Sequence, residues 1–291
     1  MPKFCLSGQR KSAGYFFPSH PQISIMPVSQ LYGLIGYPLG HSFSKKYFSE
    51  KFEREGIANA RYELFPIEDV AELTKICLDH PDLKGLNVTI PHKQAVMPLL
   101  HAVDETAQAI GAVNVIRRQD GRLMGFNSDA YGFEQSLLRL LVKLGIFIEL
   151  QEGTRFQQAK KLEAFVLGTG GASKAVAYVL NRQGIPFRYV SRQPEGADQL
   201  SYKDLPEARP ADTCVLWVNT TPVGTFPKVE EMPPMDTGLL EAGDIAFDLI
   251  YNPPKTKWMA MAEEKGAAIQ NGLEMLHLQA EKAWRIWQET T

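Results

Sequence analysis

Short apolar runs alternate along the chain with segments in which apolar residues recur every three or four positions. The apolar runs have the length of strands and predict strands at 31–37, 61–67, 83–90, 164–168, 187–191, 213–219, 244–251 and 267–270. The periodic segments predict helices at 44–56, 68–80, 91–101, 132–145, 172–184, 256–266 and 273–288. This alternation is typical of an α/β fold with parallel sheets covered by helices on both faces.

Two interruptions change this picture. Asp120 and Gly121 separate two strand-like runs within 112–129, and this residue pair predicts a tight hairpin turn. Residues 145–163 lose periodicity in a charged, glutamine-rich stretch. We therefore expect a linker-like insertion there.

Residues 1–25 stand apart from the rest of the chain. They lack the continuous apolar core of a secretory signal, and they show no clear periodicity. Met26 follows shortly before the first predicted strand. We expect either that Met26 is the natural start or that 1–25 is a loosely held, flexible extension.

Composition excludes several classes of protein. The 291 residues are 44% hydrophobic and 22% charged, with a net charge of −2, so the chain lacks the basic surface typical of nucleic-acid binding. No apolar run reaches the roughly 18 residues of a membrane-spanning helix. Cys5, Cys77 and Cys214 are too few and too far apart for a disulfide framework or a metal site. We expect a cytoplasmic protein of two domains without a bound metal.

A glycine-rich loop marks the best-defined binding motif. Gly168, Gly170 and Gly171 lie between an apolar strand and a helix with an apolar face. Glycines let the backbone approach a pyrophosphate, and the following helix start offers free N–H groups to that anion. A plain glycine-rich turn is the alternative. The strand before, the helix after and the next strand together favour dinucleotide binding.

The end of the following strand indicates which dinucleotide is bound. An acidic residue there would hold the ribose hydroxyl of NAD, but this chain has Ser191 and Arg192. A guanidinium suits the additional phosphate of NADP. Glu195 nearby is a contrary charge, and Arg192 as a plain surface residue is the alternative. The sequence favours NADP over NAD.

Polar residues also gather where the strand at 83–90 meets the next predicted helix. Asn87, Thr89 and Lys93 lie on this otherwise apolar element, and Pro91 is expected at the first helical position. Lys93 then falls in the first turn. Hydride transfer to a ketone requires a positioned proton donor, and a lysine can serve as one.

With these residues placed, the sequence from about 31 to 291 resembles the shikimate dehydrogenase family. The motifs that carry the resemblance occur in order: GHSFS at 40–44, NVTIPHK at 87–93, GAVNV at 111–115, GFNSDAYG at 125–132, GTGGAS at 168–173, NTTPVG at 219–224, DLIYNPPKT at 248–256 and NGLEMLHLQA at 271–280. Some positions differ from the usual family pattern, namely Phe43, Lys45, Lys46, Val115, Ser128, Ser191 and the GTFP sequence at 224–227.

The resemblance implies an enzyme that reduces 3-dehydroshikimate to shikimate with NADPH, in aromatic amino-acid biosynthesis. Lys93 and Asp129 would then form the catalytic pair. The residues implied to bind substrate are Ser42, Ser44, Asn87, Thr89, Asn114, Tyr251 and Gln279. Those implied to bind NADP are Gly168, Thr169, Gly170, Gly171, Ala172, Ser191, Arg192, Asn219, Thr220, Thr221, Pro222, Val223, Gly224 and Gly272.

Each of these residues also has an ordinary structural interpretation. A lone Lys93 is more typical of a solvated lysine in a first helical turn, and Asp129 is typical of a helix cap. Ser42 and Ser44 also suit a cap, Asn114 and Asn127 suit turns, and Gln279 suits a solvent-facing position. The order of the motifs, rather than any single residue, favours the catalytic interpretation.

The expected architecture is two α/β domains with a cleft between them. Residues 26–132 with 271–291 would bind substrate, and 133–270 would form a Rossmann-type NADP domain. The expected partner is a small-molecule substrate, without nucleic acid or membrane, on a monomer or homodimer. Two other functions stay open: a quinate/shikimate dehydrogenase of broader substrate range or NAD use, and a sensor that binds shikimate-like ligands without turnover.

Overall fold

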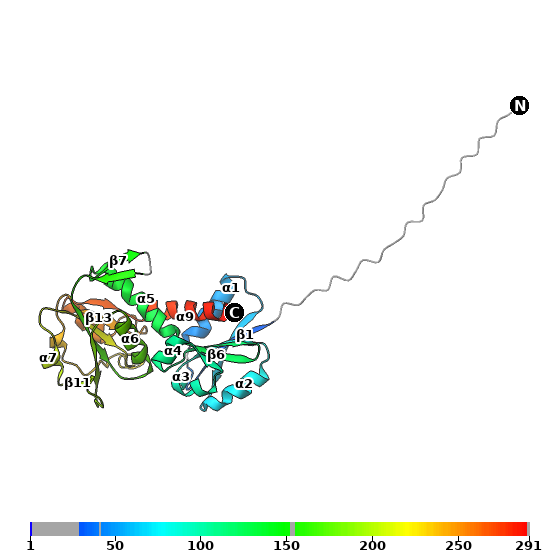
Figure 1. Ribbon diagram of the computed structural model, residues 1–291, viewed down its shortest axis with the longest axis horizontal. Coiled ribbons are helices and arrows are strands. Elements are labelled where there is room, and N and C mark those ends of the chain that lie inside the picture. The colour runs from blue at the N-terminus through cyan, green and yellow to red at the C-terminus, as the bar shows by residue number, and fades with distance from the viewer. Residues whose placement is uncertain (2–28, 41, 152–154, 290–291) are drawn as a thin grey trace.

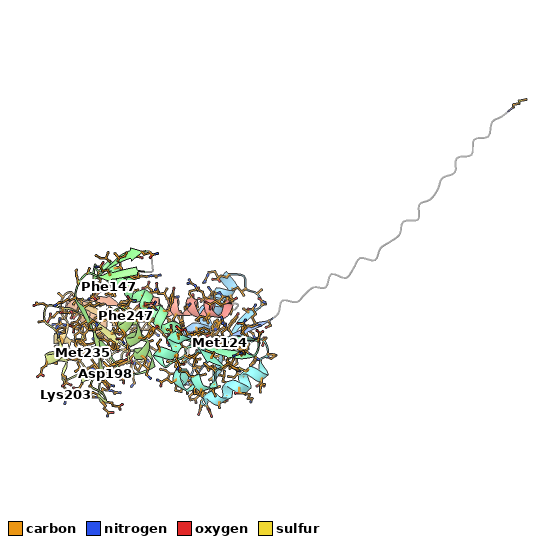
Figure 2. All side chains as sticks on the ribbon, in the orientation of Figure 1. Met124, Phe147, Asp198, Lys203, Met235 and Phe247 are labelled. Atoms are coloured by element: carbon orange, nitrogen blue, oxygen red, sulfur yellow. The ribbon has the colours of Figure 1, made fainter. Side chains whose placement is uncertain are left out.

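Two six-stranded sheets lie side by side and are joined by two long helices (Figure 1). A computed structural model describes Met1 and residues 29–40, 42–151 and 155–289. Side chains fill the space around each sheet, with Met124 in one half and Phe247 in the other (Figure 2). The expected two-part α/β architecture is therefore present.

The first sheet has the strand order β2-β1-β3-β5-β6-β4. Its strands are β1 (Gln30–Gly36), β2 (Ala60–Pro66), β3 (Leu83–Val88), β4 (Ala102–Val103), β5 (Val115–Gln119) and β6 (Arg122–Phe126). β1 pairs in parallel with β2 and β3, whereas β5 runs antiparallel to both β3 and β6. Asp120 and Gly121 both have positive φ, so the predicted hairpin turn is confirmed.

The second sheet has the strand order β11-β10-β9-β12-β13-β14, and all of its pairings are parallel. Its strands are β9 (Leu162–Leu167), β10 (Phe187–Ser191), β11 (Gln199–Ser201), β12 (Cys214–Asn219), β13 (Ile245–Asp248) and β14 (Ala268–Gln270). This is the order of the dinucleotide-binding fold, in which the chain reverses direction across the sheet after the third strand.

Helices cover both sheets. They are α1 (Phe43–Arg54), α2 (Leu73–Asp79), α3 (His92–Ala95), α4 (Glu105–Ile110), α5 (Ser128–Lys143), α6 (Gly171–Arg182), α7 (Leu205–Ala208), α8 (Lys257–Glu264) and α9 (Leu273–Gln288). Short 3₁₀ turns occur at η1 (Val70–Glu72), η2 (Met97–Leu99) and η3 (Thr237–Leu239). Among the described residues, no helix has both the length and the apolarity needed to cross a membrane.

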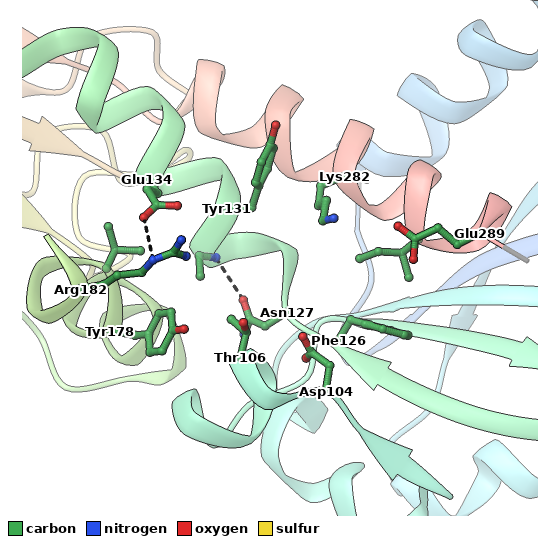
Figure 3. Close-up of a pocket in the computed structure, with 13 residues that line it drawn as sticks. Asp104, Thr106, Phe126, Asn127, Tyr131, Glu134, Tyr178, Arg182, Lys282 and Glu289 are labelled. Atoms are coloured by element: carbon green, nitrogen blue, oxygen red, sulfur yellow. Dashed lines mark hydrogen bonds and ion pairs between the residues drawn. The ribbon is translucent and has the colours of Figure 1, made fainter. Parts of the chain in front are cut away.

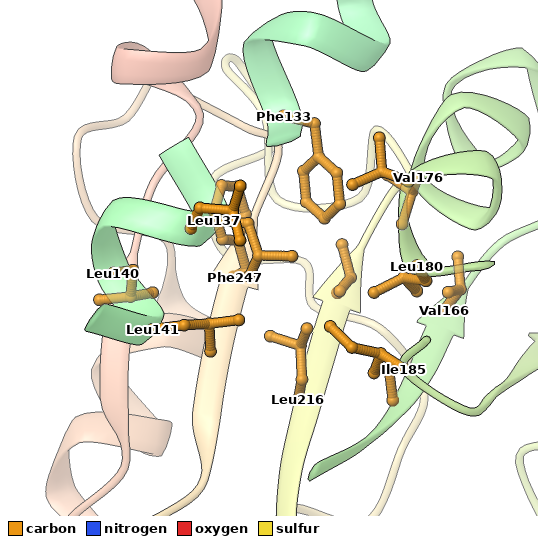
Figure 4. Packing of buried hydrophobic residues seen from close by; sticks show 14 of the residues in the cluster. Phe133, Leu137, Leu140, Leu141, Val166, Val176, Leu180, Ile185, Leu216 and Phe247 are labelled. Atoms are coloured by element: carbon orange, nitrogen blue, oxygen red, sulfur yellow. The ribbon is translucent and has the colours of Figure 1, made fainter. Parts of the chain in front are cut away.

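Helices α5 and α9 connect the two halves. Phe133 and Leu137 of α5 pack with Val176 of α6 and Phe247 of β13 in the core over the second sheet (Figure 4). α9 instead buries Ala283, Ile286 and Trp287 with the aromatic cluster over the first sheet. The chain therefore returns to the first half at its end, as the sequence predicted.

Two predicted segments differ from the structure. Residues 145–163 are not a linker, because β7 (Phe147–Gln151) and β8 (Arg155–Gln158) form an antiparallel hairpin. Most of its described side chains face solvent, so the hydrophobic pattern that marks a strand is weak there. The helix expected at 91–101 shortens to α3 and η2, since Pro98 has no N–H to continue an α-helix. The prediction about 1–25 lies outside the described residues.

Candidate active site

Polar side chains from both halves of the chain line one cavity of about 330 Å³ beside the C-terminal ends of β1 and β3. The cavity brings together every residue that the sequence assigned to catalysis or substrate binding: Ser42, Ser44, Asn87, Thr89, Lys93, Asn114, Asp129, Tyr251 and Gln279. Leu34, Val88 and Leu276 complete an apolar part of the wall. Such a mixture suits a small polar ligand with an apolar ring face.

Lys93 and Asp129 form an ion pair inside this cavity. Lys93 Nζ donates to Asp129 Oδ2 over 2.6 Å, and the two side chains are 20% and 14% exposed. Asp129 does not cap its helix, because Asn127 Oδ1 accepts the N–H of Ala130 instead. Asp129 therefore stands in the first turn of α5 with its carboxylate turned to the lysine.

Two hydrogen bonds hold the backbone around Lys93 in place. Pro91 is the residue before α3 rather than its first residue, so Lys93 is the second helical residue. The Lys93 carbonyl accepts the N–H of Val113 over 2.7 Å, which ties α3 to the loop before β5. His92 is buried, and its ring bonds to the carbonyl of Ile67 over 2.7 Å. The buried His92 ring thus helps to hold α3 in place.

Three buried polar side chains form a connected hydrogen-bond network at the cavity. The Ser128 N–H donates to Asn114 Oδ1 over 2.7 Å, and Asn114 Nδ2 donates to Ser128 Oγ over 3.1 Å. Ser128 Oγ also donates to Gln279 Oε1 over 3.3 Å. Ser128 is fully buried and was not among the predicted site residues. Its position between Asn127 and Asp129 was the available signal.

The serine loop also contributes to this cavity. Ser42 caps α1, with its Oγ accepting the N–H of Lys45 over 3.4 Å, and it also lines the cavity. Phe43 stacks on Tyr47 and meets Tyr251 edge-on, with ring centroids 5.9 Å apart in the second case. This contact joins α1 of the first half to a loop of the second half at the cavity wall.

The glycine loop opens a second, larger space. Gly168 has φ of 104°, and Gly170 is the residue before α6. A cavity of about 620 Å³ adjoins it, lined by Gly168, Thr169, Gly170, Val190, Ser191, Arg192, Tyr202, Thr220, Thr221, Pro222, Val223, Glu231, Met232 and Pro234. Free N–H groups at the start of α6 and this space fit a dinucleotide.

The predicted phosphate-binding residue is accessible. Arg192 is exposed and also lines a neighbouring cavity of about 590 Å³ with Glu195. Burial raises the pKa of Tyr202, and the nearby Arg192 guanidinium opposes this by lowering that pKa. Ser191 Oγ accepts the N–H of Gln193 over 3.1 Å, so its hydroxyl shapes the turn. The guanidinium of Arg192 is the group here that fits a ribose phosphate.

Five predicted cofactor residues do not line these cavities: Gly171, Ala172, Asn219, Gly224 and Gly272. Asn219 is fully buried, and its Oδ1 accepts both the N–H and the hydroxyl of Thr221. Gly272 allows a close backbone approach, because a Cβ there would lie 2.1 Å from the Leu249 carbonyl oxygen. Asn219 and Gly272 therefore determine the backbone conformation of the neighbouring loops.

Asp248 extends the hydrogen-bond network that Asn219 forms with Thr221. Its carboxylate accepts from Asn219 Nδ2 over 3.0 Å and from the Thr256 hydroxyl over 2.8 Å. Burial raises the pKa of Asp248 to about 6, and the hydrogen bonds from the Ile250 N–H, Thr256 and Asn219 partly oppose this shift. The ionised carboxylate therefore holds the ends of β12 and β13 together at an energetic cost.

A further cavity of about 340 Å³ lies between α4, α5, α6 and α9 (Figure 3). Figure 3 shows Arg182 turned toward Glu134, and their ion pair spans 3.6 Å. Lys282 lies 5.8 Å from the ring centre of Tyr131. None of the predicted site residues lines this cavity. Across the described parts of the chain, no cluster of His, Cys, Asp or Glu could hold a metal ion.

Comparison with known proteins identifies similar chains over most of this length. Residues 34–116 match the family profile described as the shikimate dehydrogenase substrate binding domain. The chain is 37% identical over 273 residues to shikimate dehydrogenase (NADP(+)) of Geobacillus kaustophilus, covering 89% of this chain and 93% of that protein. It is 39% identical over 268 residues to the protein of the same name from Oleidesulfovibrio alaskensis, covering 89% of each.

Solved structures are similar as well. Shikimate 5-dehydrogenase from Thermus thermophilus, in complex with NADP(H) and shikimate, matches with a TM-score of 0.71 and 31% identity. The match covers 89% of this chain and 93% of that chain. The two-sheet architecture described above is therefore shared along nearly the whole length of both proteins.

Proposed function

The chain belongs to the shikimate dehydrogenase family, and from that premise we propose how its residues reduce 3-dehydroshikimate to shikimate with NADPH. It is an oxidoreductase of the shikimate pathway, which leads to aromatic amino acids. The observation that carries the proposal is the 2.6 Å contact between Lys93 and Asp129 within a cavity lined by hydroxyl and amide groups.

Lys93 and Asp129 are proposed as the catalytic pair. NADPH supplies the hydride when it is bound. Negative charge then develops on the former carbonyl oxygen, which requires a positioned proton donor. Lys93 donates that proton in the direction of reduction and accepts it in the direction of oxidation, and Asp129 orients the lysine. The ion pair inside the cavity supports these roles.

The remaining lining residues are proposed to bind the substrate. Ser42, Ser44 and Tyr251 offer hydroxyls to the substrate carboxylate. The ring hydroxyls are assigned to Asn87, Thr89, Asn114 and Gln279.

The residues of the glycine loop fit NADP. Gly168, Gly170 and the N–H groups at the start of α6 are proposed to hold the pyrophosphate. Arg192 is proposed to bind the ribose phosphate that distinguishes NADP from NAD. The wall at 220–223 is proposed to line the nicotinamide end, and the close turn at Gly272 is proposed to shape the neighbouring loop.

Three further assignments belong to the same proposal. The substrate domain comprises 26–132 with 271–291, and the NADP domain comprises 133–270. The packing of α9 on the first sheet supports this division. We place the enzyme in the cytoplasm, since Cys77 and Cys214 are free thiols. A monomer or homodimer would suffice, because the described residues complete the cavity within one chain.

Initial rates with two substrates and two cofactors test the proposal. We expect oxidation of shikimate with NADP⁺, followed by nicotinamide absorbance, and much slower rates when quinate or NAD⁺ is substituted. Comparable rates with quinate or NAD⁺ would instead indicate an enzyme of broader range. Shikimate binding detected by calorimetry without any turnover would indicate a sensor and would contradict the proposed activity.

A further inference from the structure

Tyr62 lies directly behind the substrate cavity without being one of the residues that line it. It belongs to β2, is only 3% exposed, and stacks on Phe48 with ring centroids 4.9 Å apart and an interplanar angle of 10°. Burial raises the pKa of the Tyr62 phenol well above its ordinary value. The phenol therefore keeps its hydrogen at neutral pH and is fixed in place.

The Tyr62 hydroxyl contacts two residues of the cavity wall. It donates to Asn87 Oδ1 over 2.7 Å, and both partners are buried. The Ser44 side chain also forms a hydrogen bond with Tyr62. This bond lowers the pKa of the tyrosine by less than burial raises it. Ser44 and Asn87 are assigned above to different ends of the substrate. One buried hydroxyl thus supports both ends of the binding site.

We propose that Tyr62 is a positioning residue that fixes the orientation of the Asn87 carboxamide. A protonated phenol has one hydrogen, and it points at Oδ1, so the amide oxygen faces Tyr62 and Nδ2 faces away. Among the described residues, the hydrogen-bond partner of Nδ2 is the Asn114 carbonyl, at a long 3.5 Å. Asn87 therefore presents an N–H donor to the cavity. This inference rests on the proposed function, because it treats Asn87 as a substrate-binding residue.

Tyr32 provides a matched comparison. It pairs in register with Tyr62 on the neighbouring strand, is 1% exposed and belongs to the same aromatic cluster. Its hydroxyl bonds to Gln30 over 2.8 Å and to Gln288 over 3.0 Å, and neither of these residues lines the cavity. Removing this hydroxyl perturbs the same core without touching the site.

Kinetics of Tyr62→Phe with Tyr32→Phe as control test the inference. Loss of the Tyr62 hydroxyl leaves the buried amide oxygen of Asn87 without its donor. The Asn87 carboxamide can then rotate so that its oxygen and nitrogen exchange places. We expect KM for shikimate to rise about 10-fold or more in Tyr62→Phe, with kcat within about threefold of wild type. KM for NADP⁺ should not change, and Tyr32→Phe should alter neither constant. An unchanged KM for shikimate in Tyr62→Phe would overturn the inference.

A double-mutant cycle separates positioning from general loss of packing. In a chain that already carries Asn87→Ala, Tyr62→Phe should raise KM by less than about twofold, because the residue through which it acts is gone. An equal rise in both backgrounds would show that Tyr62 affects shikimate binding by a route other than Asn87, and it would overturn the inference. KM is independent of the folded fraction, so partial unfolding does not mimic the expected result.

A neutron structure of the wild-type chain gives a test without mutation. A deuteron on Tyr62 directed at Asn87 Oδ1 would support the inference. A deuteron directed elsewhere, or Asn87 Nδ2 facing Tyr62, would overturn it. This test also separates the two proposals, since a wild-type chain that fails to oxidise shikimate contradicts the proposed function while the neutron density still decides the amide orientation.

Discussion

At the scale of single residues, Asn127 and Ser128 decide where Asp129 points. Asn127 caps α5, and Ser128 hydrogen bonds to Asn114. The Asp129 carboxylate makes neither of these interactions. The sequence placed these polar residues side by side but left open which of them caps the helix. That choice depends on the neighbours each side chain meets after folding, and Asp129 meets Lys93.

Lys93→Ala tests the proton-transfer role. Without the amine, the proposed proton donor to the developing oxyanion is gone, so kcat should fall by about 10²–10⁴-fold. KM for shikimate should stay within about tenfold, because the hydroxyl and amide walls are intact. Lys46→Ala, at a lysine whose side chain is 78% exposed on α1, is the control. Steady-state kinetics that show retained turnover would exclude Lys93 as the proton donor.

Arg192→Leu tests cofactor choice. The guanidinium contributes mainly to binding of the phosphate that NAD lacks. KM for NADP⁺ should therefore rise about 10-fold or more, while kcat/KM with NAD⁺ stays similar. Arg122→Leu, at an exposed arginine in the β5–β6 hairpin, is the control. Equal losses with both cofactors would indicate that Arg192 supports the loop rather than the phosphate.

Asp248→Asn tests the buried carboxylate through pH. The pKa is raised from 3.8 to about 6, so the folded chain binds this proton more tightly than the unfolded chain. The resulting stability is present below the unfolded pKa and is lost as pH rises through the folded pKa. Over that window the advantage of wild type over Asp248→Asn should shrink by at most about 3 kcal/mol.

Urea unfolding at a series of pH values measures this difference. Asp212→Asn, which makes the same substitution at an exposed carboxyl group, is the control. A stability difference between wild type and Asp248→Asn that stays constant with pH would mean that the carboxylate is not destabilised by burial.

At the scale of elements, the α5–α9 contact sets the position of Gln279. Gly132 lies where these helices approach, and a Cβ there would come within 2.6 Å of the Met275 carbonyl oxygen and 3.0 Å of Gln279 Cβ. The sequence placed Gly132 at the start of a predicted helix but did not show which helix it faced. The packing partner became visible only in the folded chain.

Gly132→Ala should therefore disturb both stability and substrate binding. Backbone atoms of α9 cannot yield as a flexible side chain does, so unfolding free energy should fall by about 1–3 kcal/mol, and KM for shikimate should rise as Gln279 moves. Arg139→Ala removes an exposed ion pair with Glu274 between the same helices and should cost less than about 1 kcal/mol. Denaturant unfolding and kinetics of both variants give the comparison, and equal small losses would contradict the close-packing argument.

At the scale of the whole molecule, the described residues that line the cavity and the glycine loop all fall within 34–279. Both large sheets are formed between Gln30 and Gln270. The described residues that the proposed function uses therefore all lie after residue 25.

Deletion of 1–25 tests this conclusion. The shortened chain should stay folded, with a melting temperature within about 3 °C and kinetic constants within about twofold of the full chain, because no described contact of the sheets or the cavity is removed. Thermal unfolding and steady-state kinetics of both forms provide the measurement. An insoluble product, or a large rise in KM, would show that the segment belongs to the working enzyme.

The sequence by itself determined the alternation of strands and helices, the hairpin at Asp120-Gly121 and the glycine loop at Gly168. These features depend on local periodicity and backbone preference, which neighbouring residues specify. It missed the β7–β8 hairpin, whose mostly exposed strands carry little hydrophobic pattern.

Only the tertiary structure decided which polar residues meet. Lys93 and Asp129 are 36 positions apart, and Ser128 and Gln279 are 151 positions apart, yet each pair is in contact. Such contacts depend on how the two sheets pack through α5 and α9, which no local pattern specifies. The same holds for Tyr62, an apparently ordinary strand residue whose hydroxyl reaches Asn87 because two strands flank β1 in one sheet.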